Sequence, residues 1–300
     1  MRFLDVKTDY AFKKVFGSAA SKPILASFLN ALIGFPPGHE IADLEIVDPY
    51  QIPMLQGMKD TYVDVKAVLA DGRRIIVEMQ VLNVRGFEQR ILYNAAKSYS
   101  RQLWEGEDYT LLNPVIALTL TDFELFEGEE DTSRFLLLEK ERFIQYRDDI
   151  ELIFVELPKF AKTEEELVTV KDKWLYFVKN AGRLALVPRA LDEAPIREAF
   201  AIANTAALTE EELEQQERRH DFIRLQRGAQ EKAREDGWAK GLAEGKAEGK
   251  AEGLAEGLAK GEHAKAVAVA RKLLPVLDDA AIAAVAELPL DEVARLRAES

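Results

Sequence analysis

The sequence predicts an α/β protein in which helices flank a mixed β-sheet, followed by a helical C-terminal extension. Residues 60–80, DTYVDVKAVLADGRRIIVEMQ, hold two Val- and Ile-rich runs around Ala70-Asp71-Gly72, a pattern typical of a β-hairpin. Residues 115–120 form a continuous apolar run after Pro114, as expected for a strand buried on both faces. Several other segments show the apolar spacing of amphipathic helices.

The residues before the hairpin predict two helices and a strand. Thr8 is a candidate N-cap of a short amphipathic helix within residues 5–17. Ser21 caps a second helix that ends at Gly34. Residues 41–47 alternate weakly and predict the first strand.

The residues after the hairpin predict further helices and strands. A helix of about 18 residues is expected after Gly86, ending near Gly106. Thr163 and Glu166 have the spacing of a capping box at the start of another helix. The remaining expectations are strands at residues 135–138, 143–146 and 152–157, and helices at residues 196–206 and from Thr209 onward.

The turn of the hairpin decides whether its polar residues share a face. A two-residue loop would send the carboxylates of Asp64 and Glu78 to opposite faces, because a shift of one residue inverts a strand. A three-residue loop ending in a left-handed Gly72 sets Asp64 directly opposite Glu78. The same register sets Tyr62 opposite Gln80. We favour it, because it also brings the apolar residues of both strands to one core-facing side.

In that register, two carboxylates and an amide gather on adjacent strands. Like charges directly opposite each other are destabilising, so Asp64 and Glu78 need a positive companion. Oxygen ligands of this kind suit Mg²⁺, Mn²⁺ or Ca²⁺. The alternative is that Asp64, Glu78 and Gln80 form only the solvated face of an antiparallel sheet.

Several motifs in order resemble a known family. Asp-x13-Glu-x-Gln on paired strands is similar to the core of the PD-(D/E)XK nuclease superfamily, with Gln80 where lysine usually stands. Over most of residues 1–230 the sequence resembles the Rpn family of recombination-promoting nucleases, also called PD-(D/E)XK nuclease family transposases. The matching segments are DVKTDYAFKKVFG (5–17), DVKA (64–67), VEMQ (77–80) and LYNAAKSY (92–99).

This resemblance implies a restriction-endonuclease-like fold and metal-dependent hydrolysis of DNA phosphodiester bonds, in the setting of DNA recombination. Asp64 and Glu78 would hold Mg²⁺, or Mn²⁺ or Ca²⁺, and Gln80 would orient the attacking water. The positive charge of the usual lysine would come from Lys66 or from Lys97. Asp9, on the helix before the sheet, is a further candidate metal ligand.

The helix after the hairpin is the expected DNA-phosphate contact. Its Gln89, Tyr93 and Lys97 are spaced four residues apart, with Arg90 and Arg101 beside them. Gln89-x-x-x-Tyr93 also resembles the Q-x-x-x-Y element of RecB-like nucleases. Lys13, on the first helix, is a second candidate for approaching phosphate. The alternative for each is a solvated helix face.

Composition limits the function classes. The net charge of −13 lacks the basic footprint of a strong nucleic-acid binder, so DNA contact must rely on local patches, and a non-catalytic oligomeric scaffold is the alternative function. The chain has no cysteine, which suits a reducing cytoplasm, and its three histidines are too dispersed for a local zinc motif. No run is apolar enough to suggest a membrane span, and the acidic, polar start is unlike a signal peptide.

The C-terminal residues change in composition. We divide the chain into a nuclease-like domain at residues 1–230, a segment at 231–263, and a small helical tail at 264–300. From Gly237 to Gly261 glycine recurs at every fourth residue, which weakens an isolated helix. A helix continuing from Thr209 would wind a stripe of small residues that allows self-association into a homo-oligomer. A flexible linker is the alternative.

Overall fold

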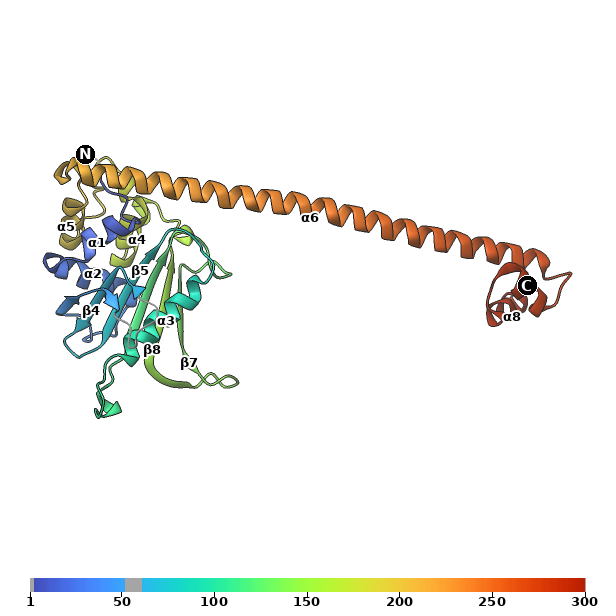
Figure 1. Ribbon diagram of the computed structural model, residues 1–300, viewed down its shortest axis with the longest axis horizontal. Helices are drawn as coiled ribbons and strands as arrows, with labels where there is room; N and C mark the ends of the chain where they lie inside the picture. The colour runs from blue at the N-terminus through green and yellow to red at the C-terminus, as the bar shows by residue number, and fades with distance from the viewer. Residues whose placement is uncertain (1–2, 52–60, 300) are drawn as a thin grey trace. The chain divides into compact units, whose positions relative to one another are not determined.

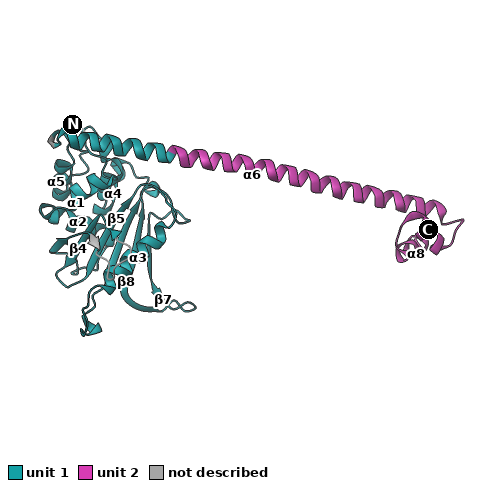
Figure 2. Cartoon of the chain, viewed as in Figure 1, with its two compact units in different colours: residues 1–227 teal, residues 228–300 magenta. Residues whose placement is uncertain are grey.

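The computed structural model describes residues 3–51 and 61–299, so Asp60, the first residue of the predicted hairpin, lies outside the described part. The chain divides into two compact units, residues 1–227 and residues 228–300 (Figure 2). The candidate site residues that the sequence predicts all belong to the first unit.

A six-stranded mixed sheet forms the centre of the first unit (Figure 1). Strands β5 and β6 and strands β6 and β8 pair in parallel, whereas the remaining neighbours pair antiparallel. A separate two-stranded sheet joins β2 (Tyr50–Gln51) and β3 (Thr61–Tyr62). The larger sheet has the order β1 (Leu44–Val47), β4 (Val65–Leu69), β5 (Arg74–Gln80), β6 (Val115–Thr121), β8 (Gln145–Glu156) and β7 (Thr132–Leu138).

Helices cover both faces of this sheet (Figure 1). We call the side that packs on helix α3 (Phe87–Ser100) the α3 face. The opposite face packs on α1 (Asp9–Phe16), α2 (Lys22–Ile33), α4 (Val170–Asn180) and α5 (Ala194–Ile202), which together form the larger apolar core. Every residue of β6 is buried, as its apolar run predicts. The α/β fold class inferred from the sequence is therefore confirmed.

Local sequence signals explain where the first two helices begin and end. The Thr8 side chain accepts a hydrogen bond from the Ala11 amide at the start of α1, as predicted. At the end of α2, Gly34 adopts a left-handed conformation with φ +65°. Short 3₁₀ turns occur at Ala19–Ser21, Tyr109–Leu111, Leu157–Lys159, Glu164–Glu166, Ala181–Arg183 and Thr205–Ala207.

Three predicted boundaries are wrong. The Thr163 capping box is real, but it closes only a 3₁₀ turn, and α4 begins at Val170 behind a second capping box made by Thr169 and Asp172. Helix α3 ends at Ser100, short of Gly106, since residues 101–114 form turns and loops around one 3₁₀ turn. The strands predicted at residues 143–146 and 152–157 are largely one long strand, β8, because irregular pairing with β7 lets it continue.

Helix α6 (Glu210–Leu273) runs from the first unit into the second, which confirms the predicted helical C-terminal extension. Its residues 228–265 are all exposed. Beyond them, α7 (Asp279–Ala286) and α8 (Leu290–Ala298) pack with the last turns of α6 around a small apolar core. Within residues 3–51 and 61–299, none of the helices combines the length and apolar character that crossing a membrane requires.

Candidate active site

The β4–β5 hairpin has the three-residue loop that the sequence favours. Leu69 donates its amide to the Arg73 carbonyl at 2.9 Å, and Gly72 adopts φ +89°. Val65 and Val77 form the last pair of this ladder. Asp64, just before β4, and Glu78, within β5, are the next residues beyond that pair.

The ladder ends at Asp64 because its side chain takes the place of a main-chain acceptor. The Asp64 amide donates to the Val77 carbonyl at 3.1 Å, but the Met79 amide donates to Asp64 Oδ2 at 2.8 Å. The chain bends there, and Tyr62 pairs with Tyr50 in the small sheet. The predicted pairing of Tyr62 with Gln80 is therefore wrong.

Glu78 points toward α3 and is almost fully buried. Asn94 Nδ2 donates to Glu78 Oε1 at 2.6 Å, and Arg90 Nη2 lies 3.5 Å from Glu78 Oε2. The same Arg90 nitrogen donates to Gln80 Oε1 at 2.6 Å, while Gln80 Nε2 donates to the Leu82 carbonyl at 2.7 Å. One arginine thus holds the acid and the amide together.

Asp64 meets a lysine from a different helix. Lys13 Nζ, on α1, lies 3.2 Å from Asp64 Oδ1, and the Lys13 side chain is 44 % exposed. Asp9 is near enough for its charge to raise the Asp64 pKa, but its Oδ2 is paired with Arg219 Nη2 of α6 at 2.8 Å. Lys13 thus lies beside Oδ1, the Asp64 oxygen that the Met79 amide does not hold.

Burial raises the pKa of both acids. For Asp64, desolvation outweighs the Met79 amide and Lys13, which favour the charged form. For Glu78, desolvation outweighs Arg90 and Asn94, and the neighbouring Asp64 charge raises the pKa further. Two buried, mutually repelling carboxylates are a site that attracts additional positive charge.

Other residues predicted for the site have different surroundings. Lys66 lies in the field of Arg74 and Arg101, and burial followed by these two charges lowers its pKa. Lys97 is 5 % exposed, donates to Thr61 Oγ1 at 3.3 Å, and places its Nζ 5.7 Å from the centre of the Tyr93 ring, so it is buried beneath Tyr93 and is not part of an exposed stripe. The face of α3 turned toward the sheet carries Arg90, Asn94 and Lys97 instead.

Asn94 is a site residue that the sequence reasoning missed. It is fully buried, and it follows Arg90 by four residues, so helical periodicity places the two side chains on one face. Three buried atoms of this face, Arg90 Nε, Asn94 Oδ1 and Ser98 Oγ, have no hydrogen-bond partner among residues 3–51 and 61–299. Such groups cost free energy unless something satisfies them.

The two carboxylates leave few oxygen atoms for binding a metal ion. Among the described residues, no group of three or more His, Cys, Asp or Glu side chains is placed to hold a metal ion. The Asp64 Oδ2 and Glu78 Oε1 atoms accept hydrogen bonds from Met79 and Asn94. Asp64 Oδ1 and Glu78 Oε2 remain, and these face Lys13 and Arg90.

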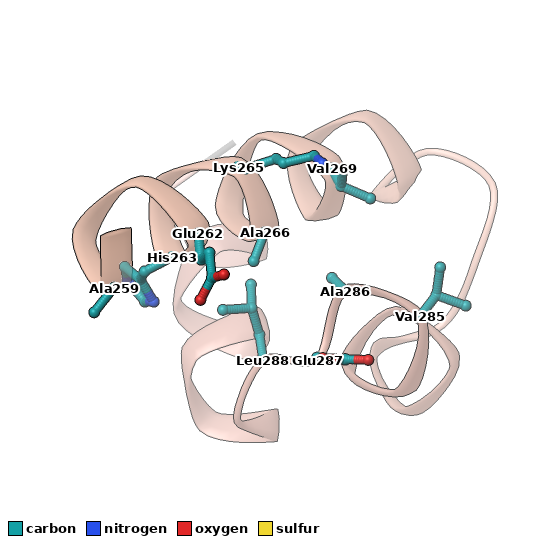
Figure 3. Close-up of a pocket in the computed structure, with 10 residues that line it drawn as sticks. All are labelled: Ala259, Glu262, His263, Lys265, Ala266, Val269, Val285, Ala286, Glu287 and Leu288. Atoms are coloured by element: carbon teal, nitrogen blue, oxygen red, sulfur yellow. The ribbon is translucent and has the colours of Figure 1, made fainter. Parts of the chain in front are cut away.

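The second unit has its own groove, between the last turns of α6 and the turn at residues 285–288 (Figure 3). Its lining is mixed, with Ala266, Val269 and Leu288 beside Glu262 and Lys265. Two acids line this groove, Glu262 on α6 and Glu287 at the end of α7.

The mixed sheet, with one acid just before β4 and a second acid and an amide two residues apart on β5, defines a nuclease-like α/β protein. Residues 6–232 match the family described as PD-(D/E)XK nuclease family transposase, and the chain belongs to that family. No curated protein and no solved structure matches the chain.

Proposed function

We propose that this protein is a metal-dependent DNA endonuclease that hydrolyses phosphodiester bonds. The observation that carries the proposal is the pair of acids beside the last pair of the β4–β5 ladder, buried Glu78 and half-buried Asp64, which lie near enough for the Asp64 charge to raise the Glu78 pKa. Membership of a nuclease-like transposase family supports it. A part in DNA recombination follows from the same family likeness.

The donor set fits a hard divalent cation such as Mg²⁺, Mn²⁺ or Ca²⁺. Mg²⁺ is commonly bound through one or two carboxylates, with water and substrate phosphate completing its shell. Asp64 and Glu78 would hold it, and Asp9 stays a weaker candidate because Arg219 already engages it. When bound, such an ion polarises the phosphoryl oxygen and lowers the pKa of an attacking water.

The chain's own residues would orient that chemistry. Arg90 contacts both Glu78 and the Gln80 amide and so keeps them close together. From there Gln80 would orient the attacking water by hydrogen bonding. Exposed Gln89 and Tyr93 and the half-exposed Arg101 are the proposed DNA-phosphate contacts. Lys66 lies near Arg74 and Arg101, and Lys97 lies against Thr61. Both lysines would add to the positive electrostatic potential of the site without contacting Glu78.

Plasmid nicking tests the proposal. The full chain is expected to nick DNA with Mg²⁺ or Mn²⁺ and to stop in EDTA. Asp64→Asn and Glu78→Gln, which preserve shape, should each lower the rate by about 1000-fold or more while the circular dichroism spectrum is unchanged. Exposed Glu88→Gln, on the outer side of α3, is the matched control. No cleavage with Mg²⁺, Mn²⁺ or Ca²⁺ would contradict the proposal.

The second candidate function is an oligomeric scaffold that does not cleave DNA. The net charge of −13 favours it, as does the exposed part of α6. Trp238 and Leu242, and farther along Leu254 and Leu258, are exposed at four-residue spacing on this helix, with Lys246 and Lys250 between the two pairs. We propose that residues 231–263 join copies of the chain, which light scattering of the full chain and of a Leu254→Glu, Leu258→Glu variant tests. A monomer in both cases would contradict it.

A further inference from the structure

We propose that Lys13 of α1 supplies the positive charge that lysine supplies at the Gln80 position of the wider superfamily. This inference rests on the proposed nuclease function and gives Lys13 a different role from the phosphate contact expected from the sequence. Gln80 is neutral, and its two polar ends are engaged by Arg90 and by the Leu82 carbonyl. The charge must therefore come from elsewhere.

Among the lysines within residues 3–51 and 61–299, Lys13 is the one whose ammonium contacts one of the two acids. Its Nζ lies 3.2 Å from Asp64 Oδ1, and its charge also lowers the pKa of Glu78. Lys66 lies instead among Arg74 and Arg101. Lys97 is buried against Thr61. Of these three lysines, Lys13 therefore has the position from which a single charge acts on both carboxylates.

The base of Lys13 is rigid while its tip is accessible. Phe12, Val15 and Phe16 of α1 are fully buried, and Thr8 caps the helix, so the backbone at residue 13 is held in place. The side chain itself is 44 % exposed. A fixed base holds the ammonium beside Asp64 without moving the helix, so its charge can offset the negative charge that develops in the transition state.

Lys13 and a divalent cation would share the same oxygen of Asp64. The ammonium faces Oδ1, because Oδ2 is held by the Met79 amide. Two positive charges near one carboxylate repel each other. Removing the lysine should therefore tighten cation binding while it weakens catalysis, whereas a lysine that merely orders Asp64 would weaken cation binding when lost.

Lys13→Met and Lys14→Met are the decisive pair, because Lys14 is the next residue of the same helix and pairs with Glu212 and Tyr10. Three quantities are measured on the full chain. They are plasmid cleavage with Mn²⁺, Mn²⁺ affinity by calorimetry in the absence of DNA, and affinity for duplex DNA in the absence of metal. Lys13→Met should cleave about 100-fold more slowly. It should bind Mn²⁺ at least about threefold more tightly. Its DNA affinity should stay close to that of Lys14→Met.

Cleavage by Lys13→Met at the rate of Lys14→Met would overturn the proposal, as would unchanged or weaker Mn²⁺ binding. A loss of DNA affinity that matches the loss of cleavage would return Lys13 to the role of phosphate contact. If the parent chain binds Mn²⁺ but cleaves no DNA, the nuclease function fails and calorimetry alone decides the place of Lys13. A parent that binds no Mn²⁺ overturns both. Lys13→Gln carries the same expectations should Lys13→Met fail to fold.

Discussion

The two faces of the central sheet differ in what they bury. The face opposite α3 packs four helices around a continuous apolar core that contains Trp174, Phe16 and Phe28. The α3 face has a smaller apolar cluster and then, toward one end, a row of buried polar groups that includes Glu78 and Asn94. The first face buries apolar side chains, which stabilises the fold, whereas the second also buries charged and polar groups at a cost in stability, as proposed functional sites often do.

The largest expected effect is the loss of Trp174, on the face opposite α3. Its ring is fully buried against Phe16, Phe28 and Phe177, and its Nε1 donates to Ser27 Oγ at 3.1 Å. Trp174→Ala should lower the free energy of unfolding by about 3–5 kcal/mol in urea denaturation, because a large cavity remains.

Val170→Ala on the same helix is the control, since Val170 is 39 % exposed. It should change stability by less than about 1 kcal/mol. Equal losses for Trp174→Ala and Val170→Ala would show that α4 does not anchor this face.

A medium effect is expected on the α3 face. Asn94→Leu leaves Glu78 Oε1 without its donor, which should cost about 1–3 kcal/mol of stability at neutral pH. Losing a hydrogen bond to the charged form also raises the Glu78 pKa further. The pH at which Mn²⁺ begins to stabilise the protein should therefore move upward, which thermal melts across a pH series measure.

Ser98→Ala is the matched control for Asn94, because Ser98 is buried on the same helix and its Oγ has no hydrogen-bond partner in the described part of the chain. Its stability and its pH profile should stay close to those of the parent. A pH profile that moves equally in both variants would show that the Asn94–Glu78 hydrogen bond does not set the Glu78 pKa.

A substitution in the turn that sets the β4–β5 register should have a smaller effect on stability. Gly72 has φ +89°, and a Cβ there would lie 2.5 Å from Asn113 Oδ1. Gly72→Ala should cost about 1–2 kcal/mol in urea denaturation through backbone strain and this close approach. Gly38→Ala is the control, with φ +81° and open space around it. Equal losses would mean that only backbone strain matters at residue 72.

The smallest effect is the pH dependence of stabilisation by Mn²⁺. Burial raises the pKa of Asp64 and of Glu78, so without metal their contribution to stability is present while they are protonated and is lost as the pH rises through the raised pKa values. A cation needs the charged forms. Mn²⁺ at ten times its dissociation constant should therefore add about 1.4 kcal/mol near pH 7.5 and much less near pH 4.5. A gain independent of pH would place the ion elsewhere.

Local signals in the sequence predicted much of the fold and part of the site. The alternation of apolar residues and the position of Gly72 fixed the hairpin register, because only one loop length brings both apolar sides to the core. The bend at Asp64 was not predictable in the same way. A strand pattern that continues through Tyr62 gives no sign that a side chain replaces a main-chain acceptor.

Contacts between distant segments account for the rest. Lys13 meets Asp64 across the gap between α1 and β4, and Arg219 meets Asp9 across 210 residues of chain, and neither pair has a spacing that local periodicity detects. Asn94 was within reach of sequence reasoning. It lies one turn after Arg90 on the same side of the helix, but an uncharged asparagine in a helix is not by itself a signal of a functional site.

The hydrogen bond from the Met79 amide to Asp64 Oδ2 makes the backbone of β5 a reporter on the carboxylate. A proton or cation that binds Asp64 withdraws electron density from the acceptor of that bond, so the Met79 amide resonance should shift along the whole titration. Because the chain contains only four methionines, selective ¹⁵N labelling of this residue type would follow the occupancy of Asp64 with few competing signals.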